Sequence, residues 1–244
     1  MIAASAATAT GISEILVTIE LTGGSGAGGW GDGGNSTSGA GGKAMATFLL
    51  PPGTSLSWTL GSGGNYGINK STGGVGGAGF GTGGNGGTQD GNQTAGGGAG
   101  SSAVILTADS TLLAVAAGGG GATTHNGSGS YATGGSTSND SPSSQGGAGS
   151  KNGTNGPTGS DDAVTGCRGG GGGANSTRDG GAPSYGGESY VNIVDYSGTV
   201  ITSYTLTPPA AVSGQVNGSS GTIKITDGNG TATYTSGSGT HVVA

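Results

Sequence analysis

The sequence contains few side chains that could act as catalysts. The two histidines are His125, in a polar segment, and His241, three residues before the last residue. A serine hydrolase needs a G-x-S-x-G turn between a strand and a helix, and no segment has helical periodicity. The single Cys167 excludes an internal disulfide. Its neighbour Arg168 could activate the thiol, but burial against the glycine-rich core is the favoured interpretation. The sequence therefore predicts a protein that is not an enzyme.

Metal and cofactor motifs are also incomplete. Gly42-Lys43 is followed by alanine instead of Ser or Thr, so the phosphate-binding loop pattern fails. Repeated G-x-G-x-x-G matches follow from the glycine content alone. The segments GGWGDGG and GGTQDGN resemble calcium-binding repeats but have no nine-residue period. Asp161-Asp162 is interpreted as an exposed acidic pair. We therefore expect no cofactor and no metal.

Aromatic residues in loops are better candidates for binding. Trp30 lies inside a glycine tract, while Tyr66, Tyr131 and Tyr185 lie in turn-rich segments. Aromatic rings in loops on a rigid scaffold commonly contact sugars or protein receptors. Tyr131 is the favoured contact residue, together with Trp30 and Tyr185. The alternative for Trp30 and Tyr185 is that they close the ends of a glycine stack.

Nine of the 13 asparagines begin an Asn-x-Ser/Thr triplet. Four are Asn-Gly-Ser/Thr, which the chemistry of tight turns explains: Asn126, Asn152, Asn217 and Asn229. The other five are candidate sites of N-glycosylation on an exposed surface: Asn35, Asn69, Asn92, Asn139 and Asn175.

The composition indicates that glycine itself forms the core. The chain of 244 residues has 64 glycines, 7% charged residues and a net charge of −6. Such a glycine content is typical of disorder, but the charge is too low to keep the chain open by repulsion. Glycine-rich chains can instead pack as extended threefold helices that hydrogen-bond to one another. GGVGGAGFGTGGNGG (73–87) breaks the three-residue period that collagen needs.

The segments between the glycine tracts predict strands. In EILVTIEL (14–21) every second residue is apolar, which puts Ile15, Val17, Ile19 and Leu21 on one face, and TSLSWTL (54–60) alternates with Leu56, Trp58 and Leu60 inward. KAMATFLL (43–50) is a further strand, ended by the turn signal Pro51-Pro52-Gly53. SAVILT and TLLAVAA, separated by Ala108-Asp109-Ser110, predict a hairpin over 102–117. Three further strands are expected late in the chain, at 189–196, 199–206 and 221–226. The predicted fold is all-β: short antiparallel strands around packed polyglycine-II-type helices, with no α-helix.

We divide the chain into three parts. Residues 1–10 form an N-terminal arm, 11–226 a glycine-rich domain with a polar insert at 123–166, and 227–244 a tail or hairpin. MIAASAATAT lacks the basic region and apolar stretch of a signal peptide. No apolar stretch approaches the ~18 residues of a membrane span. The six Lys and Arg residues are scattered, which argues against nucleic acid as a partner.

The order of these segments resembles the glycine-rich module of phage tail-fibre tips and adhesins. The resemblance rests on GISEILVTIELTGGSGAGG, LPPGTSLSWTLGSGG, TAGGGAGSSAVILTADSTLLAVAAGGGG and GSSGTIKIT, and covers roughly 11–226. The glycine-rich extracellular region of the anaplastic lymphoma kinase receptor family is similar. In the phage adhesins, the resemblance implies a stack of polyglycine helices with receptor-binding loops at its distal end. The insert at 123–166 departs from this pattern.

The leading hypothesis is a non-enzymatic, extracellular adhesive protein, such as a viral tail-fibre or appendage component on the virion surface. Its expected partners are a host cell-surface receptor, either glycan or protein, and other virion subunits in a homo-oligomer. The alternative is a glycosylated subunit of a self-assembling filament or surface layer, joined through exposed strand edges. An ice-binding protein is a third possibility, although the threonines show no regular spacing in the sequence.

Overall fold

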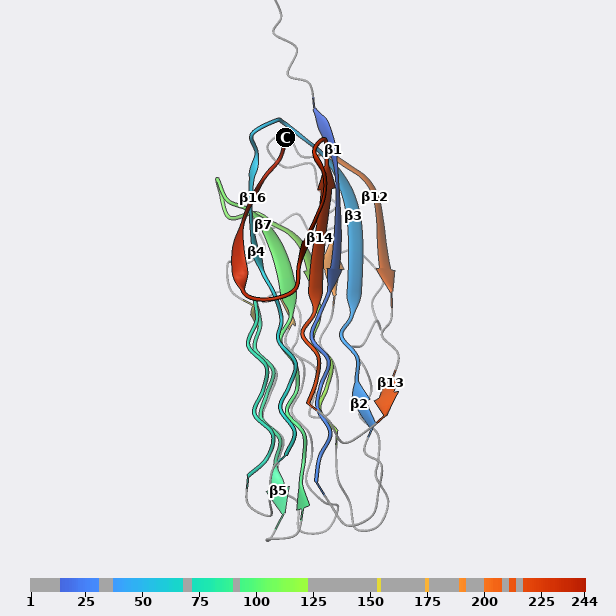
Figure 1. The fold of residues 1–244 in the computed structure, drawn as a ribbon, viewed down its shortest axis with the longest axis vertical. Coiled ribbons are helices and arrows are strands. Elements are labelled where there is room, and N and C mark those ends of the chain that lie inside the picture. Colours follow the sequence, from blue (N-terminus) through green and yellow to red (C-terminus); the bar gives the residue numbers. More distant parts are fainter. Residues whose placement is uncertain are drawn as a thin grey trace, which may run out of the picture.

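The computed structural model describes residues 14–30, 37–67, 72–89, 93–122, 153–154, 174–175, 189–191, 200–207, 211–213 and 217–244. Two antiparallel sheets occupy one end of an elongated molecule, and extended glycine-rich segments run from them to the other end (Figure 1). Within these ranges the secondary structure consists of strands and turns, without a helix. The predicted all-β fold is confirmed.

The first sheet has five antiparallel strands. Their order is β12 (Val200–Thr207), β3 (Lys43–Leu50), β1 (Ile15–Thr22), β14 (Thr222–Asp227) and β15 (Gly230–Tyr234). Strand β1 lies at the centre because its alternating apolar residues can pack inward along its whole length.

The second sheet also has five antiparallel strands. Their order is β11 (Tyr190–Val191), β8 (Leu112–Ala116), β7 (Ser102–Leu106), β4 (Ser55–Thr59) and β16 (Ser238–Val242). Strands β7 and β8 form the hairpin predicted over 102–117. Of the strand predicted over 189–196, the structure describes only 189–191.

Three pairs of short strands complete the described structure. They are β2 (Thr37–Gly39) with β13 (Ala211–Ser213), β5 (Thr88–Gln89) with β6 (Gln93–Thr94), and β9 (Gly153–Thr154) with β10 (Ala174–Asn175). Apart from β9, the polar insert at 123–166 lies outside the described residues.

The last two strands differ from the expected tail or hairpin over 227–244. Strand β15 pairs with β14 in the first sheet, whereas β16 pairs with β4 in the second. The hairpin turn is instead at Asp227–Gly230, where Gly230 has a φ of 113°. This segment therefore links one edge of the first sheet to one edge of the second. Local pattern could not reveal this, because it does not specify which partner a strand will find.

A compact apolar core lies between the two sheets. Every second residue of β1 points into it, so Val17 and Ile19 are fully buried and Leu21 nearly so. The second sheet contributes Leu56, Trp58 and Val104, among others. The predicted inward faces of 14–21 and 54–60 are confirmed, except that Ile15, near the end of the molecule, is only partly buried.

Beyond the sheets, the glycine-rich segments bond to one another at every third residue. The amides of Gly74, Gly77 and Phe80 donate to the carbonyls of Ala95, Gly98 and Ser101, at 2.8, 2.8 and 2.9 Å. These two segments therefore run in parallel. A three-residue step is the repeat expected of polyglycine-II-type helices.

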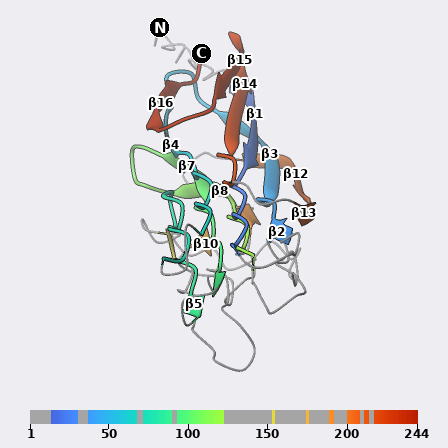
Figure 2. The same cartoon turned by 60° about the horizontal axis from the view of Figure 1, so that its bottom comes forward.

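The segment 95–101 is surrounded on several sides by other glycine-rich segments. Its successive amides point in three directions: Gly96 donates to Ala122, Gly97 to Asn65 and Gly98 to Gly84. The next three amides repeat the cycle with the same three neighbouring segments, through Gly119, Ser62 and Gly81. Such a pattern places backbone on several sides and leaves room only for glycine and for the small buried side chains of Ala95, Ala99 and Ser101. Figure 2 shows the extended segments side by side below the sheets.

The glycines are needed because the backbones touch. A Cβ atom placed on Gly96 would collide with the carbonyl oxygen of Ala27, and one on Gly118 with that of Ala99. All residues from Thr111 to Ala122 are buried, including Gly118–Gly121. The run AAGGGG therefore continues from strand β8 into a second core, in which the backbone replaces side chains.

Candidate functional site

The molecule has two distinct ends. Leu50 pairs with Ile15, and the amide of Gly53 donates to the carbonyl of Val243 at 2.8 Å. The first described residues and the last residues of the chain therefore lie together, at what we call the proximal end. The hairpin of β5 and β6 lies at the opposite end, which we call the distal end (Figure 1).

Trp30 and Tyr66 lie toward the distal end. Trp30 forms an isolated antiparallel bridge with Thr94, with N–H···O distances of 2.8 and 2.9 Å. The amide of Gly67, next to Tyr66, donates to the carbonyl of Gly28 at 3.3 Å, two residues before Trp30. Both aromatic side chains are partly buried. The backbone thus holds two aromatic residues on neighbouring segments of a rigid bundle.

The surroundings of these two residues restrain them further. The Tyr66 amide donates to the Asn217 Oδ1 atom at 2.7 Å, and partial burial raises the pKa of the Tyr66 phenol. The hydroxyl of Thr94, the residue bridged to Trp30, is fully buried and has no hydrogen-bond partner. Asn217 is one of the turn-type Asn-Gly-Ser asparagines, and its side chain stabilises the Tyr66 backbone.

The structure locates only part of the predicted site. Trp30 lies toward the distal end, whereas Tyr131 and Tyr185 lie outside the described residues. The same holds for Cys167 and for the candidate glycosylation sites Asn35, Asn69, Asn92 and Asn139. Asn175 lies in β10, of which the backbone is described. Asn229 lies in the turn between β14 and β15, as its Asn-Gly-Thr sequence predicts.

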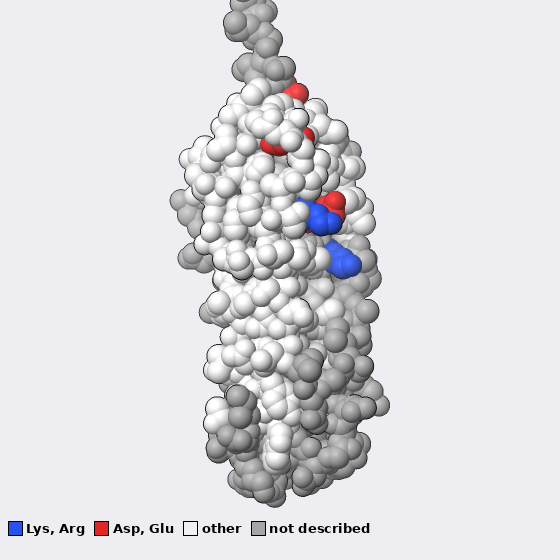
Figure 3. All heavy atoms as spheres, in the orientation of Figure 1, with Lys and Arg blue, Asp and Glu red and all other residues white. Residues whose placement is uncertain are grey.

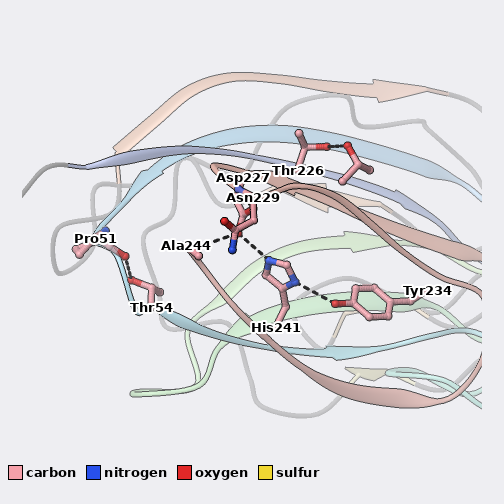
Figure 4. Close-up of polar contacts among 9 residues, drawn as sticks. Pro51, Thr54, Thr226, Asp227, Asn229, Tyr234, His241 and Ala244 are labelled. Carbon is pink, nitrogen blue, oxygen red and sulfur yellow. Dashed lines mark hydrogen bonds and ion pairs between the residues drawn. The ribbon is translucent and has the colours of Figure 1, made fainter.

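A polar network that the sequence did not indicate lies at the proximal end (Figure 4). The His241 Nε2 atom is 3.0 Å from Oδ2 of Asp227, and Nδ1 is 3.0 Å from the hydroxyl of Tyr234. The Tyr234 ring stacks on Trp58, with ring centroids 4.3 Å apart. The side chains of His241 and Asp227 are only 13% and 2% exposed.

The Asp227 carboxylate accepts hydrogen bonds from several donors. Its Oδ2 atom accepts from the Ala244 amide at 3.1 Å, and Oδ1 accepts from the Asn229 amide at 2.9 Å. Burial raises the pKa of Asp227, but the hydrogen bonds from His241, Ala244 and Asn229 outweigh burial and lower it overall. An ionised Asp227 then accepts from His241 Nε2, which leaves Nδ1 of a neutral imidazole to accept from Tyr234.

This arrangement favours a structural role for the network. Both ring nitrogens of His241 already have partners, so neither is directed at a substrate. The network instead ties the chain end to both sheets. Its members lie on β4, β14, β15 and β16, and no spacing in the sequence signals that they meet. In the described ranges, His, Cys, Asp and Glu form no cluster of three or more that could hold a metal ion.

No known protein family matches the sequence, and a search of curated proteins finds no relative. In the part of the chain that the structure describes, no helix has the length and apolar character needed to cross a membrane.

Proposed function

We propose that this protein is a non-enzymatic adhesive fibre component that contacts a host cell-surface receptor with the distal end of its glycine bundle. The observation that carries the proposal is that the two ends of the molecule differ. Both ends of the described chain lie at the proximal end, while partly exposed aromatic side chains lie toward the distal end. Attachment and contact would thus use opposite ends of a rod.

The glycine bundle suits a rigid connection between these ends. A central segment such as 95–101 forms hydrogen bonds to three neighbouring segments, and each neighbour is contacted again three residues later. Bending this segment would therefore break hydrogen bonds on several sides. A rigid scaffold lowers the entropic cost of ordering contact residues on binding. Trp30 and Tyr66 would then act as pre-organised contacts, because Trp and Tyr are enriched among residues that dominate binding energy.

The described surface carries little charge. Its charged side chains are Glu14, Glu20, Lys43, Asp109 and Lys224, because the side chain of Asp227 is buried. Figure 3 shows most of one face without Lys, Arg, Asp or Glu. Long-range electrostatic steering would therefore be weak, and recognition would depend on aromatic and hydroxyl contacts at short range.

The second candidate function is a subunit of a self-assembling filament. It is favoured by the edge of β15, where Thr231 and Thr233 are exposed and where, among the strands that the structure describes, β14 is the only partner. An unpaired strand edge can add a strand from another molecule. This candidate predicts concentration-dependent polymers, whereas the adhesive proposal predicts discrete particles that bind cells.

The test is the binding of fluorescently labelled protein to a panel of intact microbial cells. We expect the double variant Trp30→Ala/Tyr66→Ala to lose binding. Tyr204→Ala is the matched control, because Tyr204 is an exposed aromatic residue on β12 of the first sheet, away from the distal end. Undiminished binding by the double variant, or equal loss in the control, would contradict the proposal. Electron microscopy of the same samples distinguishes particles from polymers.

A further inference from the structure

A groove of about 310 Å³ lies on the outer face of the first sheet. Its lining includes Glu20 and Thr22 of β1, Lys43 and Met45 of β3, and residues of β12 and β14. The strand register explains why these side chains meet. Lys224, Glu20 and Met45 lie in one row across three strands, and Thr222, Thr22 and Lys43 lie in the next.

The groove gathers positive charge on an acidic protein. The chain has a net charge of −6, yet both of the cationic side chains in the described ranges, Lys43 and Lys224, line this groove. Figure 3 shows the Lys side chains on one face, the upper one beside an acidic side chain, while the other acidic side chains in this view lie near the top. Lysine ammonium groups present three donors each and bind carboxylates.

Neither lysine uses all the hydrogen-bond donors of its ammonium group within the protein. Lys224 Nζ is 3.8 Å from Oε2 of Glu20, beyond hydrogen-bond distance, and both side chains are about half exposed, at 47% and 48%. Lys43, the first residue of β3, is exposed. The ammonium groups therefore keep donors for a ligand, and the carboxylate of Glu20 keeps acceptors.

Hydroxyl groups complete the lining. The Thr22 and Thr222 hydroxyls are 2.8 Å apart, and the Thr22 hydroxyl also accepts from the Thr222 amide at 2.7 Å and lies 3.4 Å from the Thr222 carbonyl oxygen, to which it can donate. The Thr222 hydroxyl oxygen therefore keeps a lone pair for a ligand. Thr205 of β12 lies opposite Met45 and adds another hydroxyl. Met45, 38% exposed, adds a small apolar surface between them.

We infer that this groove binds a carboxylate-bearing saccharide. The ligand's carboxylate would lie between Lys43 and Lys224, and its hydroxyl groups would donate to Glu20 and Thr222 and exchange hydrogen bonds with Thr205. The mixture of donors and acceptors distinguishes this ligand from an acidic peptide, because a peptide of acidic residues has few hydroxyls to donate to Glu20. The groove's volume suits one or two sugar rings. This site is separate from the distal contact in the proposed function and does not depend on it.

The test is a titration of the isotope-labelled full chain with digalacturonate, followed by amide NMR shifts. We expect saturable shifts at Thr22, Lys43 and Lys224, and much weaker shifts with the neutral disaccharide cellobiose. Lys43→Gln/Lys224→Gln should weaken binding at least about tenfold, because the ligand's carboxylate would lose both of its charged donors. Lys43→Arg/Lys224→Arg is the matched control and should bind within about threefold of wild type.

Three results would overturn the inference. The first is that digalacturonate shows no saturable binding at concentrations up to about 20 mM, which are high enough to detect even weak specific binding. The second is equal binding of cellobiose, or binding that the double Gln variant retains. The third is equally tight binding of tetra-aspartate, which would make the groove a site for acidic peptides. Both Lys positions changed in these variants are exposed, and unchanged amide spectra elsewhere would verify that each variant folds.

Discussion

The carboxylate of Asp227 and the imidazole of His241 join the two sheets through a hydrogen bond of 3.0 Å. Asp227 ends β14 in the first sheet, whereas His241 lies in β16 of the second. Because Asp227 also accepts from the Ala244 amide, the same carboxylate secures the last residue of the chain. This contact closes the proximal end of the molecule.

Removing the charge at Asp227 should destabilise the protein. In Asp227→Asn, an amide NH2 group would face donors that now meet a carboxylate oxygen. We expect a loss of about 1–3 kcal/mol in the free energy of unfolding, measured by urea denaturation. Asp109→Asn is the control, since Oδ1 of the exposed Asp109 accepts from the Thr111 amide in a turn, a contact that asparagine can also make. An equal loss in both variants would contradict the assigned role.

Asp227 should also make stability depend on pH. Its pKa is lower in the folded protein than in the unfolded chain, so the folded state stabilises the ionised form. This stabilisation is present above the unfolded pKa of about 3.9 and is lost as the pH falls through the lower, folded pKa. Urea denaturation between pH 6 and pH 2 should therefore show a smaller acid-dependent loss for Asp227→Asn than for wild type. Parallel curves would exclude Asp227 as a source of the acid sensitivity.

Two glycine substitutions should distinguish two reasons for requiring glycine: close packing of neighbouring backbones and a positive φ angle. Gly96→Ala would drive a Cβ atom into the Ala27 carbonyl inside the bundle, so we expect a loss of about 3 kcal/mol or more, or failure to fold. Gly53→Ala has open space around it and is limited only by its φ of 80°, which costs about 1–2 kcal/mol. Thermal denaturation of both variants measures the difference. Equal effects would mean that close backbone packing is not the main requirement for glycine.

The Ser102 hydroxyl should be important where the second sheet meets the bundle. It accepts from the Gly61 amide at 2.9 Å and donates to the Thr22 carbonyl at 2.8 Å. Ser102→Ala would leave a buried amide without a partner, at a cost of about 1–3 kcal/mol. The control is Ser57→Ala, which removes a solvent-exposed hydroxyl contact with Thr107 and should cost well under 1 kcal/mol. Chemical denaturation compares the two, and similar losses would refute the bridging role.

Several features could be predicted from the sequence because they depend on local pattern. Alternating apolar residues in 14–21 and 54–60 indicated strands with one buried face, and the Ala-Asp-Ser turn indicated the hairpin of β7 and β8. The glycine content together with low charge indicated a core made of backbone.

Other features depend on which distant segments meet, and only the tertiary structure decided them. The sequence could not indicate that β15 and β16 join different sheets, or that Asp227 and Tyr234 would reach His241. Thr18, Thr47 and Thr226 show no regular spacing in the chain, yet antiparallel register aligns them in one row on the first sheet. The groove formed by Glu20, Lys43 and Lys224 has the same origin.

Local pattern thus determined what each segment of this protein can become, because strand periodicity and the absence of a glycine side chain act within a few residues. The pairing of segments follows from the register of hydrogen bonds between residues up to about two hundred positions apart, such as Thr22 and Thr222. That register results from packing the two sheets and the glycine bundle at the same time, and it positions both the proximal network and the groove.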